Sequence, residues 1–172
     1  AELQKVLQNL LRERISIRDL ESILETLGDY ARRIKDPDTL TEYARHAMAR
    51  TICRQFQEED GKIYAVTLDP KVEEMIQAST EHNERGTFLT LPPRTVSRLM
   101  NAISREVERL VAAGHPAVLL CSPALRPQVR RACELSGLQV AVLAYNEVAQ
   151  TPVESMGQVS LAEAPAPSGA SS

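Results

Sequence analysis

Three amphipathic helical stripes follow one another between residues 3 and 56, and they constrain the fold more than any other feature of the chain. In each stripe apolar side chains recur every three or four residues, which places them on one face of a helix. The stripes are Leu3, Val6, Leu7, Leu10 and Leu11; Ile17, Leu20, Ile23, Leu24 and Leu27; and Leu40, Tyr43, Ala44, Ala47, Met48 and Ile52. Ser16 and Asp36-Pro37 stand where the second and third helices should begin. The sequence therefore predicts a unit of three packed helices.

The next segment, residues 61–150, alternates between short β-rich runs and helical patterns. The predicted strands cover 62–68, 87–91, 117–121 and 138–145, and the predicted helices cover 70–76, 94–113 and 125–135. Residues 79–86 are polar and are predicted to form a loop. The later elements follow the order β-α-β-α-β, whose connections are long enough for parallel pairing, and the strand at 62–68 is expected to add an edge.

These patterns divide the chain into three regions. Residues 1–60 form the helical unit, residues 61–150 form a small α/β unit with a mostly parallel sheet, and residues 151–172 are rich in Pro, Ala, Ser and Gly. The last region offers few side chains for a core, so we expect a disordered tail. The expected fold class is therefore a mixture of α+β and α/β, with the helices first and the sheet second.

The charge of the chain is nearly balanced. It carries 20 Lys and Arg against 23 Asp and Glu, and residues 1–60 hold ten basic and twelve acidic side chains. Trp is absent and aromatic residues make up 3%, so neither the phosphate contacts nor the base stacking of a nucleic-acid-binding protein is expected.

No window approaches the ~20 consecutive apolar residues of a membrane span, and Ala1-Glu2-Leu3 begins in a helical stripe without a signal peptide. We expect a soluble segment.

Residue types that often carry chemistry are present, but they form no catalytic or metal-binding pattern. Neither the histidines nor the cysteines show the spacing of metal ligands, and the cysteines lie in apolar runs typical of buried, reduced thiols. These residues are His46, His82, His115, Cys53, Cys121 and Cys133. Ser122 follows a predicted strand, where ligands often bind in α/β folds, but its neighbours lack the glycines of a nucleophile elbow or a phosphate loop. We therefore expect no catalytic residue, no metal site and no cofactor.

Two charged surfaces are candidates for protein interaction. The first is an arginine stripe opposite the apolar face of the helix at 94–113, confined to an arc of about 60° and formed by Arg94, Arg98, Arg105 and Arg109. It is either an ordinary solvated face or a docking site for an acidic partner or a neighbouring subunit. The second lies between the second and third helices and consists of Arg32, Arg33, Lys35 and Asp36. Its mixed charges suit contact between copies of the chain, but capping of the third helix explains Asp36 equally well.

Two long strings of the sequence resemble the cytoplasmic domain of bacterial type III secretion export-gate proteins. They are LQKVLQNLLRERISIRDLESILETLGDYARRIKDPDTLTEYARHAMAR at residues 3–50 and HPAVLLCSPALRPQVRRACELSGLQVAVLAYNEV at residues 115–148. This family comprises the flagellar FlhA type and the virulence counterparts of the InvA, LcrD and SctV type. The chain reads LAYNEV at 143–148, whereas the flagellar pattern reads close to LSYNEI, so a virulence (injectisome) member is favoured.

This resemblance implies a function in protein export. The intact family domain has four subdomains and assembles as a homo-oligomeric ring under the export gate, at the cytoplasmic face of the bacterial inner membrane. There it receives chaperone–substrate complexes and the stalk of the export ATPase. The chain resembles the last two subdomains, with the third at residues 1–60 and the fourth at 61–150. It would be held to the membrane only through a preceding N-terminal region, and the resemblance implies no catalysed reaction.

Two other functions fit parts of the sequence. Three short helices with tight turns are compatible with a helix-turn-helix DNA-binding module, although the acidic excess in residues 1–60 argues against it. A small nucleotide-binding α/β domain would use the strand end near Ser122. A salt-dependent DNA shift assay would detect the first function, and thermal stabilisation by a nucleotide would detect the second.

Overall fold

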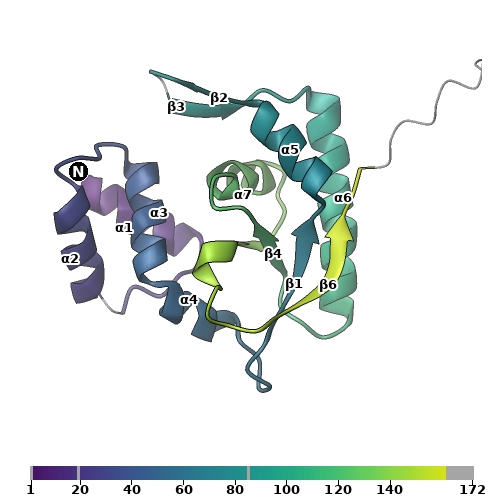
Figure 1. Cartoon of the computed structure of the whole chain (residues 1–172), viewed down its shortest axis with the longest axis horizontal. Coiled ribbons are helices and arrows are strands. Elements are labelled where there is room, and N and C mark those ends of the chain that lie inside the picture. Colours follow the sequence, from purple (N-terminus) through teal and green to yellow (C-terminus); the bar gives the residue numbers. More distant parts are fainter. Residues whose placement is uncertain (1, 19, 85, 162–172) are drawn as a thin grey trace, which may run out of the picture.

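The chain folds as a helical unit packed beside a parallel sheet that carries further helices (Figure 1). The computed structural model describes residues 2–18, 20–84 and 86–161. Within this part of the chain no helix is both long enough and apolar enough to cross a membrane. The mixed fold class predicted from the sequence is confirmed, with the helices first and the sheet second.

The N-terminal unit consists of α1 (Glu2–Arg12), α2 (Leu20–Tyr30), α3 (Pro37–Ala47) and α4 (Ala49–Phe56). The start of α3 follows the prediction, because the Asp36 carboxylate accepts hydrogen bonds from the N–H groups of Asp38 and Thr39. The third apolar stripe was predicted as one helix, but it divides at Met48, where the backbone leaves helical geometry with φ −95° and ψ 13°. The prediction that Leu24 belongs to the buried stripe is wrong, since 42% of it is exposed.

Four parallel strands form the main sheet in the order β5-β4-β1-β6. Their bounds are Ile63–Leu68 for β1, Val118–Cys121 for β4, Ala141–Ala144 for β5 and Val153–Val159 for β6. The expectation that the first of these strands lies at an edge is wrong, because β1 pairs with β4 on one side and with β6 on the other. The two edges of the sheet are therefore β5 and β6.

Strand β6 also corrects the prediction of a disordered tail from residue 151. Residues 153–159 pair along the whole of β1, with a register shift between Ala65 and Val66, and Val159 is fully buried. The strand was not predicted because this segment has low hydropathy. An edge strand needs only one or two side chains in the core, since its backbone supplies the pairing with the neighbouring strand. Residues 162–172 of the predicted tail lie outside the described residues.

A separate antiparallel hairpin precedes the longest helix. Its strands are β2 (Thr80–Asn83) and β3 (Gly86–Leu89), and they project from the body of the molecule at the top of Figure 1. The prediction of a loop over residues 79–86 is therefore wrong, and so is the prediction that the strand at 87–91 joins the parallel sheet. A polar hairpin of this kind lacks the alternating apolar pattern by which strands are recognised in a sequence.

Each face of the main sheet carries its own core. Helices α5 (Pro70–Ala78), α6 (Pro93–Ala112) and α7 (Arg126–Leu135) cover one face and pack against Val66, Leu119 and Val142. The helical unit covers the other face. It packs against the strand side chains that alternate with those of the first face, including Ile63 and Leu120. The sheet residues read as continuous apolar runs because both faces are buried. Residues 1–60 therefore share a core with the α/β unit.

The connector between α4 and β1 is fixed by polar contacts. The ring of His115 lies 2.7 Å from Glu58, measured from Nδ1 to Oε2, and stacks on the ring of Tyr64 with centroids 4.1 Å apart. The Tyr64 hydroxyl donates a hydrogen bond to the Asp60 carboxylate, which raises the pKa of Tyr64 to about 12. These contacts limit movement of the helical unit at its covalent link to the sheet.

Candidate protein-interaction surfaces

The arginine stripe predicted on the longest helix lies on the outer face of α6. Its members, Arg94, Arg98, Arg105 and Arg109, are all exposed, while Leu99, Ile103 and Val107 on the opposite side are buried. One of them makes a short-range ion pair, in which Arg109 Nη1 lies 3.3 Å from Glu106 Oε1. The structure thus places the stripe at the surface, and its role in docking stays a prediction.

The charged corner predicted between the second and third helices is also exposed. Arg32, Arg33 and Lys35 lie in the connection from α2 to α3, and Asp36 caps α3. In Figure 1 this corner and α6 lie on opposite sides of the molecule. The structure does not bring the two predicted surfaces together.

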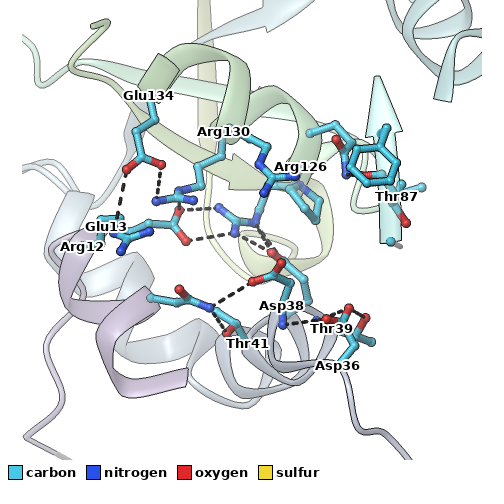
Figure 2. A pocket seen from close by; sticks show the side chains of 18 of the residues that line it. Arg12, Glu13, Asp36, Asp38, Thr39, Thr41, Thr87, Arg126, Arg130 and Glu134 are labelled. Carbon is cyan, nitrogen blue, oxygen red and sulfur yellow. Dashed lines mark hydrogen bonds and ion pairs between the residues drawn. The ribbon is translucent and has the colours of Figure 1, made fainter. Parts of the chain in front are cut away.

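A third feature escaped the sequence analysis: an arginine from the α/β unit is buried against the helical unit. Arg126, at the start of α7, is 1% exposed. Its guanidinium lies 2.7 and 3.1 Å from the two carboxylate oxygens of Glu13 and 2.8 Å from Glu42 Oε2. It also donates to the Val142 carbonyl on β5 at 2.9 Å. Figure 2 shows Arg126 between Glu13 and the helices below it.

A second buried arginine lies beside the first. Arg45 of α3 is fully buried, and its Nε and Nη2 lie 2.8 and 3.1 Å from the carboxylate of Glu147 in the short helix η1 (Tyr145–Glu147). Arg45 also donates to Val142 O at 3.3 Å, and Glu147 accepts the N–H of Ala144 at 2.8 Å. The two arginines and Glu147 therefore satisfy outward-facing backbone groups along the edge of β5.

Glu13 connects the two arginines electrostatically. It contacts Arg126 directly, and its Oε1 lies 3.5 Å from Arg45 Nη1 and 3.7 Å from Arg130 Nε. Burial raises the pKa of Glu13, but the attraction and hydrogen bonds of Arg126, with Arg45 and Arg130, outweigh burial and hold the pKa below its ordinary value. We refer to Glu13, Glu42, Arg45, Arg126 and Glu147 as the buried charge network.

The lowered pKa of Glu13 predicts that acid weakens the fold. A carboxyl group whose pKa is lower in the folded state stabilises the protein above its unfolded-state pKa of about 4.5, and that contribution disappears as the pH falls through the folded-state value. The urea midpoint should therefore fall below pH 4.5 more steeply in the wild type than in Glu13→Gln. The exposed Glu25→Gln variant serves as control, and its urea midpoint should depend on pH as that of the wild type does. The prediction would be contradicted if the midpoint of Glu13→Gln also showed the wild-type dependence on pH.

One sequence signal could have revealed the network. Arg45 lies three residues before Met48 and seven before Ile52, so it borders the apolar stripe of the third helix at its C-terminal end. An arginine at such a position is buried only when acidic partners accompany it. Its partner Glu147 is more than 100 residues away in the chain, and helical spacing carries no information about such a pairing.

An open cleft of about 390 Å³ lies between α1 and α3 of the helical unit, α7 and the β2–β3 hairpin (Figure 2). Its lining includes Asp36 and Asp38 on one side, Arg130 and Arg131 on another, and Thr87 on the hairpin. Positively and negatively charged side chains both line this cleft. Such a surface suits a polar protein contact better than a small apolar ligand.

The residues considered for chemistry contact other side chains of the protein or are buried. The Ser122 hydroxyl and N–H both donate to Glu73 Oε2, the latter at 3.2 Å, which ties α5 to the end of β4. All three cysteines are buried and unpaired by disulfides, as predicted, and burial raises the pKa of Cys133 to about 12. In the described part of the chain, no cluster of three or more His, Cys, Asp or Glu side chains is arranged to hold a metal ion.

Comparison with known proteins identifies the family. The model of the FHIPEP family matches residues 1–152. The chain belongs to the FHIPEP family. The flagellar biosynthesis protein FlhA of Bacillus subtilis is 38% identical over 161 residues, which cover 93% of this chain and 24% of that protein. The invasion protein InvA of Salmonella typhimurium is 35% identical over 149 residues, which cover 87% of the chain and 22% of InvA.

Several solved structures share this fold. The C-terminal domain of InvA superposes with a TM-score of 0.82 at 32% identity, covering 92% of this chain and 48% of that domain. The nonameric SctV-C of EPEC gives 0.80 at 25% identity over 92% and 48% of the two chains. CdsV of Chlamydia pneumoniae, solved in complex with CdsO, gives 0.82 at 31% identity over 92% and 47%.

These matches confirm the resemblance to export-gate cytoplasmic domains and define its extent. The chain spans about a quarter of the length of the curated relatives and about half of the solved domains. Flagellar and virulence relatives match at similar identities, so the choice of a virulence member stays a prediction.

Proposed function

We propose that this chain is part of a docking platform in a type III protein export gate. In this role it lies at the cytoplasmic face of the inner membrane, joins a ring of identical copies, and helps to receive chaperone–substrate complexes and the stalk of the export ATPase. The proposal rests on one observation above all: a family match over residues 1–152 combined with the fold of the InvA C-terminal domain. Two similar structures, the nonameric SctV-C and the complex of CdsV with CdsO, favour the ring and the partner protein.

The arrangement of charged residues supports a platform. The buried charge network joins the helical unit to the sheet, while the α6 stripe and the α2–α3 corner remain exposed on opposite sides. A rigid body with two separate charged surfaces can contact a neighbouring copy and another protein at the same time. We further propose that the chain catalyses no reaction, because the Ser122 hydroxyl is bound to the Glu73 carboxylate and the three cysteines are buried.

Charge reversal on α6 tests the platform proposal. Replacing Arg94 and Arg105 together by glutamate should weaken binding to neighbouring copies or to the stalk protein by about tenfold or more, since like charges facing each other cost several kcal/mol. The fold should be retained, because both side chains are exposed. Sedimentation analysis and pull-down with the stalk protein measure the two contacts, and secretion in the cell that encodes this chain measures the outcome.

A matched control changes the charge equally but elsewhere. Lys5→Glu with Arg54→Glu alters two exposed side chains of α1 and α4 and should leave both contacts unchanged. Normal self-association, stalk binding and secretion in the Arg94/Arg105 variant would remove the α6 stripe from the platform. Loss of binding in both double variants would mean that net charge, and not this surface, governs the contacts.

A further inference from the structure

The cleft of about 390 Å³ beside the β2–β3 hairpin, which we call the hairpin cleft, holds charges that the protein itself does not neutralise. Four arginines and five carboxylates line it: Arg12, Arg126, Arg130, Arg131, Glu13, Asp36, Asp38, Glu42 and Glu134. Six of these side chains form ion pairs with one another, at 2.5 to 3.8 Å. Within the described part of the chain, Asp36, Asp38 and Arg131 take part in no ion pair. An occupant of the cleft would therefore find unpaired charge at these three side chains.

The two unpaired carboxylates are held in place by neutral donors. The Asp36 carboxylate accepts hydrogen bonds from the N–H groups of Asp38 and Thr39, and from the Thr39 hydroxyl at 2.7 Å. Asp38 Oδ1 accepts from Asn9 Nδ2 at 3.2 Å. These bonds fix the positions of both carboxylates and leave their negative charge uncompensated. Because the carboxylates are already ordered, a cation that binds them costs little conformational entropy on the protein side.

The hairpin supplies an aromatic wall to the same cleft. Phe88 of β3 lines it and is 38% exposed, and Pro127 of α7 lines it nearby. Gln128 Nε2 donates to Thr87 O at 3.3 Å, which attaches β3 to α7 and positions this wall. Figure 2 shows Thr87 on the opposite side of the cleft from Asp36. The cleft therefore has an aromatic side chain on its hairpin wall and two carboxylates on its α3 wall.

This combination of side chains is complementary to an arginine. A guanidinium group stacks on an aromatic ring and bonds a carboxylate through two parallel N–H groups, whereas an ammonium group does neither as well. The basic side chains of the α2–α3 corner do not line the cleft, and none of them supplies the missing cation. On the α7 wall the unpaired charge is positive, because Arg131 is exposed there, and it attracts an acidic group.

We propose that the hairpin cleft binds a segment of a partner protein that carries an arginine and, close to it in the chain, an acidic residue. The arginine of the partner lies between Phe88 and the carboxylates of Asp36 and Asp38, and the acidic residue pairs with Arg131. Because the helical unit, α7 and the hairpin all line the cleft, the bound segment contacts both units of the fold. This inference goes beyond the platform proposal and depends neither on ring assembly nor on the α6 stripe.

Titration of the purified chain with capped peptides tests this binding. The probe contains one arginine and one glutamate separated by glycines, and NMR signals of the Thr39 amide and the Phe88 ring report on the two walls. The wild type should bind this probe at least about fivefold more tightly than the same peptide with citrulline, which keeps the shape of arginine without its charge. Equal affinity for the two peptides, or no saturable change in these signals up to about 10 mM peptide, would overturn the proposal.

Variants of the two walls locate the binding site. Replacing Asp36 and Asp38 together by asparagine should lower the affinity for the arginine peptide about tenfold, because the charge that attracts the guanidinium is lost. The fold should be retained, since asparagine caps a helix as well as aspartate does, and an unchanged urea midpoint verifies this. Phe88→Leu should weaken binding roughly threefold, because it removes the ring and keeps an apolar side chain.

A matched control removes the same charge outside the cleft. Glu21→Gln with Glu25→Gln alters two exposed carboxylates of α2 and should bind the arginine peptide as the wild type does. An equal loss of affinity in both double variants would contradict the proposal, because net charge and not the cleft would then govern binding. Self-association of the purified chain that disappears in the Asp36 and Asp38 double variant would assign the cleft to a second copy and would also refute it.

Discussion

Replacing Arg126 by methionine should destabilise the fold by about 3–5 kcal/mol, the largest effect expected of any single change outside the apolar core. The substitution leaves Glu13, which is 9% exposed, and Glu42 without their strongest partner. It also removes a donor from the Val142 carbonyl at the sheet edge. Urea unfolding, extrapolated to water, measures the loss, and the transition should remain cooperative because both cores are intact.

The control for this prediction is Arg131→Met on the same helix. Arg131 is exposed and takes no part in the buried charge network, so its replacement should change stability by no more than about 0.5 kcal/mol. Adding Glu13→Gln and Glu42→Gln to Arg126→Met should recover part of the loss, because neutral side chains cost less to bury unpaired than charged ones. A loss below about 1 kcal/mol for Arg126→Met alone would show that the network does not join the two units.

Truncation before β6 should have a comparable effect. A chain that ends at residue 152 loses the pairing along β1 and the buried side chain of Val159. It also exposes the β1 edge, where Val66 and Leu68 belong to the core beneath α6. Loss of one buried valine and several ladder hydrogen bonds should cost more than about 3 kcal/mol relative to a chain that ends at residue 161.

Denaturation of the two truncated chains under identical conditions checks this prediction. Met156→Ala in the chain ending at 161 is a suitable control, since Met156 is 45% exposed and its loss should have little effect. Equal midpoints for the chains ending at 152 and 161 would mean that the segment adds no stability, as the composition of residues 151–172 had suggested. A shift of the predicted size would place the boundary of the folded unit beyond residue 159.

The helices and the central strands could be predicted because their signals are local. Asp36-Pro37 determines the start of α3 through a cap and a fixed φ, and both operate within four residues. The apolar run at 117–121 indicates a strand buried on both faces, and β4 is such a strand. Exposure of Arg94 and Arg105 followed from the apolar stripe on the opposite face of the same helix.

The remaining features depend on contacts between distant residues. β6 holds few apolar side chains and is recognisable only beside β1, about 90 residues earlier. The hairpin of β2 and β3 is polar, so its two strands are identified by their antiparallel pairing and not by their composition. A groove of about 550 Å³ beside β5 requires the end of α1, the end of α7 and a strand edge to meet, and no single stretch of sequence contains all three.

The helical stripes, the β-rich runs that follow them and the family could all be recognised from the amino-acid sequence, because each depends on neighbouring residues or on a recognisable string. The strand order and the burial of Arg45 and Arg126 became visible only in the folded chain. An arginine is stable either in solvent or in a buried ion pair. Which of the two it adopts depends on whether folding brings carboxylates such as Glu13 and Glu147 within hydrogen-bonding distance.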